Sequence, residues 1–302
     1  RIVRLGWGWV WVLAAVAIIA ALKTPLAHSE LGATRWIKLG PVSFQAAEPI
    51  KAAIIIFFAY YVSYWGLNRW YNQLLACLLA IALLGFLFFF SNNLSTVIVL
   101  FCICAVIILS SVKKPDLYWY FLLGLALIII AAIFVTVYLL MHQGAENFRF
   151  VRIRAWLHPE EYAADEGLQA MQARYAIGAG GFWGKGLGQS LIKFKLSYSY
   201  NDFILAIICE ELGVFGVIVM MTLFGYLLYR IYKIAQNAWD IEGKVLAIGV
   251  FTQIALQLLI NVMVVTSVIP TTGVTLPFFS AGGTSVVFLL AELGMVLNVD
   301  KY

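Results

Sequence analysis

The sequence predicts an all-α polytopic integral membrane protein with about eight transmembrane helices. Of its 302 residues, 63% are hydrophobic and only 12% are charged, about half the charged fraction of soluble domains. Many apolar runs also approach the roughly 20 residues that a helix needs to cross a hydrocarbon core about 30 Å thick. Because basic residues mostly set topology in such a protein, the net charge of +5 says little about nucleic acid, and no nucleic-acid partner is expected.

The predicted spans follow the apolar runs along the chain. Short polar or proline-containing segments mark their ends, among them NRW at 68–70, SNN at 91–93 and KKPD at 113–116. The spans are expected at residues 7–22, 46–66, 72–90, 94–111, 117–141, 203–231, 244–268 and 284–299.

The basic residues of the short loops predict the orientation. One side would hold Arg69, Lys113, Arg230 and Lys244, and we assign it to the cytoplasm. The other side would hold a large extracytoplasmic loop at 142–202. The chain is therefore expected to form one membrane domain, 1–302, with this loop inside it.

The outer loop contains a glycine-dense stretch, AIGAGGFWGKGLGQS, at 176–190. A phosphate-binding Walker loop is excluded, because Ala179 and Gly186 stand where that motif needs glycine and serine or threonine. The glycines favour a tight loop with positive φ or close packing. A backbone that lies close to a ligand or to the membrane surface is the alternative.

Charged and polar residues at the predicted span ends are the candidates for a site. Glu48 and Lys51 form either a structural i,i+3 pair or an outer edge where the lysine faces an anionic ligand. Gln253, Gln257 and Asn261 make one polar stripe on a helix, for interhelical hydrogen bonds or for lining a polar cavity.

Three acids lie in YSYNDFILAIICEELG at 198–213. Asp202 precedes an apolar run, so it suits a helix N-cap or a general base at the outer mouth of a cavity. Glu210 and Glu211 lie further along the same helix, where buried carboxylates need partners. We expect these two to have structural roles.

Four stretches resemble the SEDS family (shape, elongation, division and sporulation), which includes RodA, FtsW and SpoVE. They follow the order of the family motifs and together reach from Gly32 to Ser285. The stretches are GATRWIKLGPVSFQAAEPIK, LQAMQARYAIGAGGFWGKGLGQSLIK, NDFILAIICEELGVFG and QLLINVMVVTSVIPTTGVTLPFFSAGGTS.

The resemblance implies ten spans, of which the first two are absent from this chain. Thr275, which precedes Leu276, is similar to the FtsW and SpoVE branch, whereas RodA usually has proline there. Several positions depart from the family pattern: Tyr198 replaces a glutamate, Asn93 an aspartate, Ala281 a tyrosine and Ser267 a glycine.

The resemblance also implies a peptidoglycan glycosyltransferase of the bacterial cytoplasmic membrane. Such enzymes polymerise lipid II into an undecaprenyl-linked glycan strand at the outer face of the membrane, beside a class B penicillin-binding protein and membrane lipid. Asp202 would be the catalytic base. The expected substrate-binding residues are Arg35, Glu48, Lys51, Gln172, Arg174, Lys193 and Ser280.

No cofactor or protein-bound metal is expected, although a divalent cation could share the role of the basic residues. Two other functions stay open from the residues. Intramembrane charges also suit a lipid-linked precursor flippase or transporter, and the Tyr198 departure suits a non-catalytic scaffold for cell-wall assembly.

Overall fold

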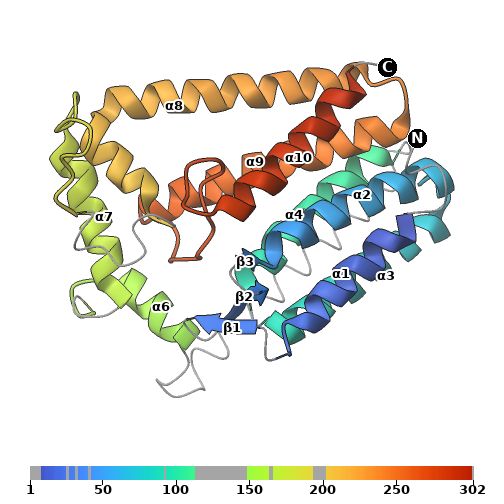
Figure 1. Cartoon of the computed structure of the whole chain (residues 1–302), viewed down its shortest axis with the longest axis horizontal. Coiled ribbons are helices and arrows are strands. Elements are labelled where there is room, and N and C mark those ends of the chain that lie inside the picture. Colours follow the sequence, from blue (N-terminus) through green and yellow to red (C-terminus); the bar gives the residue numbers. More distant parts are fainter. Residues whose placement is uncertain are drawn as a thin grey trace. The chain divides into compact units, whose positions relative to one another are not determined.

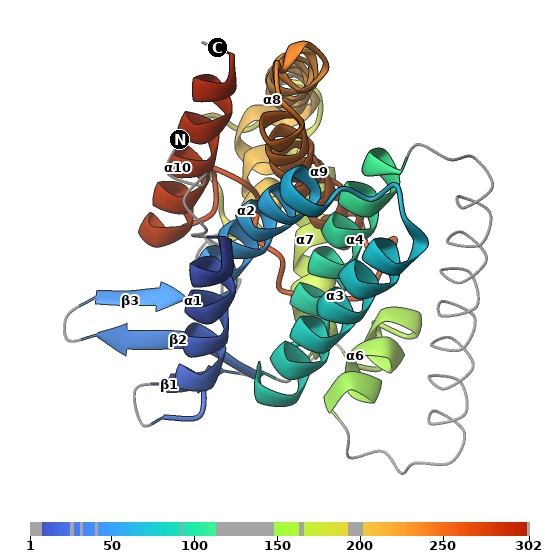
Figure 2. The ribbon, with the colours of Figure 1, turned by 90° about the vertical axis from the view of Figure 1, so that its right-hand side faces the viewer.

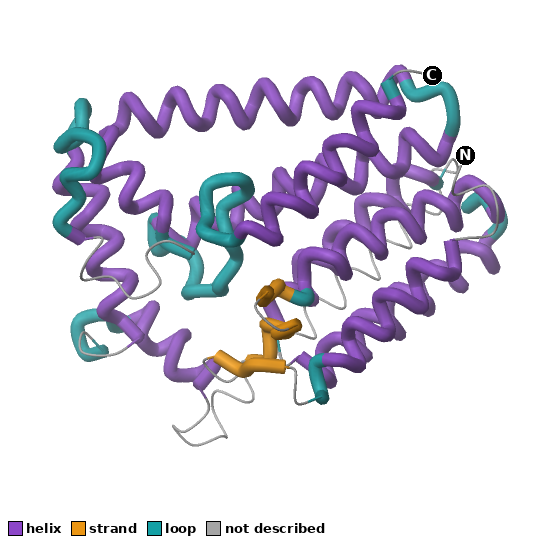
Figure 3. Tube along the Cα trace, in the orientation of Figure 1, coloured by secondary structure: helices purple, strands orange, loops and turns teal. Residues whose placement is uncertain are grey.

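The computed structural model describes residues 8–24, 27–30, 33–39, 42–91, 93–112, 148–162, 166–192 and 202–300. Most of them are helical, and Figure 3 shows the short strands and loops between the helices. The helices are α1 (Gly8–Ala21), α2 (Ala47–Trp65), α3 (Trp70–Ser91), α4 (Leu94–Ser111), α6 (Phe148–Leu157), α7 (Glu166–Gly180), α8 (Ile204–Asn237), α9 (Ile241–Val265) and α10 (Gly283–Val299).

The helices confirm the predicted fold class of an α-helical polytopic membrane protein. Within the described residues, α3, α4, α8 and α9 are long and apolar enough to cross a membrane, and α1 and α10 are shorter apolar helices. Seven of the eight predicted spans coincide with a helix, and the remaining one, 117–141, lies outside the described residues.

A small antiparallel sheet, which the sequence does not predict, occupies the segment between α1 and α2. Its strands are β1 (Ala27–Glu30), β2 (Ala33–Leu39) and β3 (Val42–Gln45), paired in that order. Figure 2 shows the strands next to α1. The register pairs Trp36 with Gln45, so the sheet ends where α2 begins.

The described residues fall into two compact units. The first comprises residues 1–113, 223–258 and 277–302, and the second comprises 114–222 and 259–276. In the first unit α2 is buried over almost its whole length, from Glu48 to Val62, as expected for a helix that is apolar on all sides. Helices α1, α4 and α10 pack against it, and Gly249 of α9 lies against Ile55.

The second unit contains α6, α7, the glycine-dense loop and the first part of α8. α6 and α7 pack against each other, so the predicted outer loop has helical structure of its own. α8 is broken at Gly213, where φ is 65° and ψ is −168°. The bend in α8 is visible in Figure 1.

Candidate active site

The break in α8 is filled by the backbone of the glycine-dense loop. In a continuous helix the carbonyls of Glu210 and Glu211 would accept from the N–H groups four residues on. Here they accept instead from Lys185 N (3.0 Å) and Gly186 N (2.9 Å). These bonds join the loop and the break into one structure.

The break also leaves two N–H groups of α8 without their usual helical acceptors, and the loop supplies carbonyls for them. Val214 N donates to the Gly181 carbonyl at 3.0 Å, and Phe215 N donates to the Phe182 carbonyl at 3.1 Å. We call residues Gly180–Ser190 the glycine hairpin. Its backbone therefore replaces two lost helical hydrogen bonds by four new ones, which fixes its position on α8.

Close backbone approach explains three of the glycines. A Cβ at Gly180 would overlap the Cys209 carbonyl, a Cβ at Gly184 would overlap that of Glu211, and a Cβ at Gly213 would overlap the Gly184 nitrogen. The prediction of a tight loop with close packing is confirmed, and the neighbouring backbone belongs to α8 of the same chain.

The Glu210 side chain binds the end of the glycine hairpin. Its side chain is fully buried. Its carboxylate accepts from Lys185 Nζ at 2.7 Å, from the Ser190 hydroxyl and from the Leu191 and Ile192 N–H groups at 3.3 and 3.4 Å. The structural role expected for Glu210 is confirmed, and its basic partner comes from the hairpin.

Asp202 lies two residues before Ile204, the first helical residue of α8. Its main-chain carbonyl accepts from Asn261 Nδ2 at 2.9 Å. The same amide donates to the Val274 carbonyl at 2.9 Å. Asn261 is fully buried, so one side chain of α9 joins the start of α8 to the loop that follows α9.

A second contact on the same loop involves the predicted binding residue Arg174. Its Nε donates to the Ser267 hydroxyl at 2.9 Å, and the indole N–H of Trp156 donates to the Ser267 carbonyl at 2.8 Å. Ser267 thus joins α6, α7 and the end of α9 within the second unit. Arg174 itself is exposed on α7.

In the first unit, Glu48 and Lys51 form the pair that the sequence allowed. Lys51 Nζ lies 2.8 Å from Glu48 Oε1, and both side chains are buried. Sequence reasoning missed a further acid nearby, Glu292, which is buried on α10 and accepts from Gln253 Nε2 at 2.8 Å. A lone carboxylate in an apolar span was the available signal.

The interhelical reading of the polar stripe on α9 is confirmed by two of its members. Gln253 donates to Glu292 on α10, and Asn261 donates to the main-chain carbonyl of Asp202, two residues before α8. Gln257 is also buried, and its Oε1 has no partner among the described residues.

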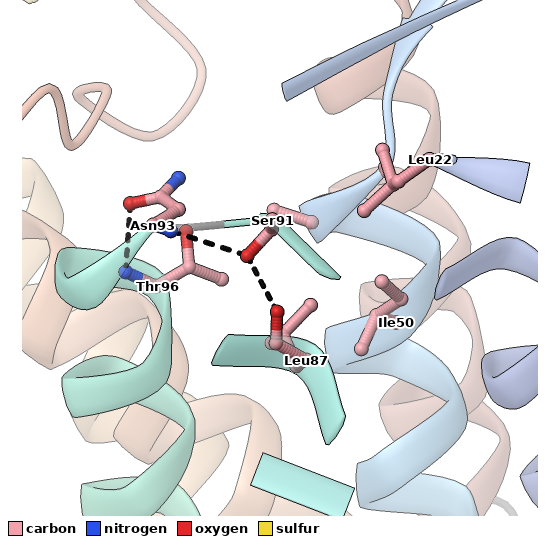
Figure 4. A pocket seen from close by; sticks show the side chains of 8 residues that line it. Leu22, Ile50, Leu87, Ser91, Asn93 and Thr96 are labelled. Carbon is pink, nitrogen blue, oxygen red and sulfur yellow. Dashed lines mark hydrogen bonds between the residues drawn. The ribbon is translucent and has the colours of Figure 1, made fainter. Parts of the chain in front are cut away.

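The family departure at Asn93 has a local explanation. Asn93 precedes α4, and its side chain accepts from Thr96 N at 3.4 Å. Figure 4 shows this contact beside a small pocket that Leu22, Ile50 and Leu87 also line. Asparagine caps a helix about as well as aspartate, so this replacement preserves the start of α4.

The other predicted site residues are spread over both units. Arg35 lies in β2, Gln172 is half-buried on α7, and Ser280 is buried in the loop before α10. Lys193 lies outside the described residues, as does Tyr198. In the second unit the structure brings together the Asp202 backbone, Asn261 and Val274, and separately Arg174 and Ser267.

The helical membrane architecture and these buried polar contacts define a polytopic membrane protein with polar residues both at helix ends and within helices. A family model described as "Cell cycle protein", covering FtsW, RodA and SpoVE, matches residues 4–302. The chain therefore belongs to the FtsW/RodA/SpoVE family, which confirms the resemblance drawn from its motifs.

Individual relatives agree with this assignment. The protein named "Probable peptidoglycan glycosyltransferase FtsW" from Trichlorobacter lovleyi is 32% identical over 291 residues, which cover 94% of this chain and 73% of that protein. Stage V sporulation protein E of Bacillus subtilis is 46% identical over 156 residues, 51% of this chain and 43% of that protein. These relatives confirm the FtsW and SpoVE branch.

A solved structure has the same fold. It is described as "Structural coordination of polymerization and crosslinking by a peptidoglycan synthase complex", and the matched chain is 25% identical with a TM-score of 0.79. The match covers 98% of this chain and 81% of that one.

Proposed function

We propose that this protein is a peptidoglycan glycosyltransferase that polymerises lipid II at the outer face of the bacterial cytoplasmic membrane. The observation that carries the proposal is the family match over residues 4–302, within which Asp202 lies at the start of α8. Its FtsW relatives are named for this activity. Chain 1–302 would act as one membrane domain, with residues 142–202 on the extracytoplasmic side.

The chemistry needs a base and a site for a leaving anion. A sugar hydroxyl attacks the anomeric carbon of a lipid-linked diphosphate, a new glycosidic bond forms, and the bond to the diphosphate oxygen breaks. Asp202 accepts the proton of the attacking hydroxyl, which contributes roughly 10²- to 10⁴-fold to the rate. Inversion in one displacement requires no covalent intermediate, so one carboxylate is sufficient.

The leaving diphosphate requires positive charge. Arg174 is the exposed candidate, and its planar guanidinium matches phosphate oxygens. Arg35, Lys51 and Lys193 are the other basic candidates, with Glu48, Gln172 and Ser280 as further contacts. Lys51 is bound to Glu48 in the structure, so binding through Lys51 would require that the pair opens or shares the anion.

We propose no cofactor for this reaction. Among the described residues, no group of three or more His, Cys, Asp or Glu side chains is placed to hold a metal ion. A divalent cation that arrives with the diphosphate would share the role of the basic residues.

The partner proposed for this chain is a class B penicillin-binding protein, which would crosslink the strands. The support is the matched structure, whose description couples polymerization to crosslinking. We expect the purified pair to polymerise lipid II and the single chain to do so weakly. The measurement is the length of glycan products on gels, with heat-inactivated protein as the control.

That assay, together with a measurement of lipid II transport across vesicle membranes, separates the alternative functions. Lipid II that crosses vesicle membranes without being polymerised would support a flippase, for which the broken α8 and the buried Glu292 are also suitable features. Neither polymerisation nor transport by the pair would indicate a scaffold. Full activity of the single chain would contradict the dependence on a partner.

Topology gives an independent expectation. Cysteine at position 187 in the glycine hairpin should react with an impermeant maleimide in intact cells, because Leu187 is exposed and would lie outside. Cysteine at position 237, at the end of α8, should react only after the cells are opened. The experiment uses a variant without Cys77, Cys102, Cys104 and Cys209. Outside labelling of position 237 would reverse the assignment.

A further inference from the structure

The C-terminal capping motif of α9 has a serine at the position that is usually glycine. Ser267 N donates to the Val264 carbonyl at 2.9 Å, and Val268 N donates to the Met263 carbonyl at 2.8 Å. This pair of bonds defines a Schellman motif, in which the residue after the C-cap adopts a left-handed conformation and is usually glycine. Here it is Ser267, with φ at 59°.

A serine in this conformation carries a conformational cost that glycine would avoid. Non-glycine residues in the left-handed region persist where other contacts hold them, often at functional sites. Ser267 has two such contacts: its carbonyl accepts from the Trp156 indole N–H, and its hydroxyl accepts from Arg174 Nε at 2.9 Å. Only the second contact depends on the serine side chain.

The bond to Ser267 constrains the Arg174 guanidinium in a useful way. It engages Nε, so the two terminal nitrogens of the exposed side chain stay available for a bidentate contact with an anion. The carbonyl end of α9 also favours a nearby cation. A glycine at position 267 would satisfy the helix end, yet it would leave Arg174 without this acceptor.

We propose that Ser267 is a positioning residue that orients Arg174 to bind the diphosphate of a lipid-linked sugar. The proposal rests on the function proposed above, because Arg174 is a binding residue only if such a substrate is used. This role explains why a serine occupies the position: its hydroxyl orients the Arg174 guanidinium, although its backbone conformation is strained.

The test compares three substitutions at position 267 in the complex with its partner. Ser267→Ala and Ser267→Gly both remove the hydroxyl, and each should raise KM for lipid II by roughly 3- to 10-fold, the range of one hydrogen bond, with little change in kcat. Ser267→Asn should restore a KM near wild type, because asparagine tolerates the left-handed region and offers a side-chain acceptor.

Stability separates this role from a purely structural one. Ser267→Gly relieves the strain, so its melting temperature should be at least as high as that of Ser267→Ala, although both bind substrate weakly. In an Arg174→Gln background the substitutions at 267 should have no further effect on KM. Thr266→Val is the matched control, because its hydroxyl bonds only within the helix end, and it should leave KM unchanged.

Binding of undecaprenyl diphosphate to the same variants provides a readout without turnover. If polymerisation is absent in wild type while Ser267→Ala still weakens this binding and Ser267→Asn restores it, the proposed function fails and the positioning role stands. Unchanged binding and KM in both Ser267→Ala and Ser267→Gly would overturn the role. The role would also be overturned if Ser267→Ala raised KM by the same factor in the wild-type and the Arg174→Gln backgrounds.

Discussion

Asp202→Asn is expected to reduce lipid II polymerisation by about 10²- to 10⁴-fold while the protein folds normally. The amide has almost the shape of the carboxylate but cannot accept the proton of the attacking hydroxyl. One contact of this residue runs through its main chain, where the carbonyl accepts from Asn261. The substitution therefore leaves that contact in place, and the loss should appear in kcat.

The controls for this prediction address folding and location. Melting temperature and co-purification with the partner should match wild type in Asp202→Asn. Glu211→Gln, two residues before the break in α8 at Gly213, changes an acid whose carboxylate accepts from Ser190 N; this variant should retain the chemical step. A rate near wild type in Asp202→Asn would show that the base lies elsewhere, and Glu48 would be examined first.

Asn261 extends the same argument to the backbone. Its amide holds both the Asp202 and the Val274 carbonyls, so it couples the start of α8 to the loop after α9. The sequence indicated Asn261 only as one member of a polar stripe. Periodicity places a side chain on a face of a helix, but it does not identify the main-chain groups of two other segments as its partners.

Local patterns in the sequence predicted the helices well. Apolar runs mark α3 and α4 within two residues of their ends, because hydrophobicity over about 20 residues is a strong signal. The pair Glu48 and Lys51 was also readable, since both lie on one turn of a helix. Such predictions succeed where the interacting residues are close in sequence.

Long-range pairings escaped prediction. The break in α8 depends on hydrogen bonds from the glycine hairpin about 25 residues earlier, as in the contact between Lys185 and Glu210. The apolar pattern continues through Gly213, so it gives no sign of the break. The small sheet was missed for a related reason: short strands such as β1 and β3, four residues each, carry little alternation to detect.

Gly213→Ala is expected to be strongly destabilising in the second unit. Gly213 has φ 65° and ψ −168°, a region that is essentially restricted to glycine and costs about 1–3 kcal/mol for other residues. The new methyl group would also overlap the Gly184 nitrogen. Relief of that overlap requires the glycine hairpin to move away from α8.

Movement of the hairpin would add the loss of its backbone bonds. The four contacts that join Gly181, Phe182, Lys185 and Gly186 to α8 each contribute about 0.5–1.5 kcal/mol. Glu210 would also lose Lys185 as its partner, and an unpaired buried carboxylate is costly. We therefore expect a lower melting temperature together with rapid proteolysis in the hairpin, and loss of activity although Asp202 is intact.

Two matched glycine variants separate the causes. Gly225→Ala lies further along α8 with open space around its Cβ, so it should stabilise the helix by up to about 1 kcal/mol. Gly181→Ala has positive φ but no close neighbour, so it should show the conformational cost alone. If Gly213→Ala melts like wild type and its hairpin resists protease, then α8 accommodates a side chain at the break. The hairpin would then not be locked to α8 by close backbone packing.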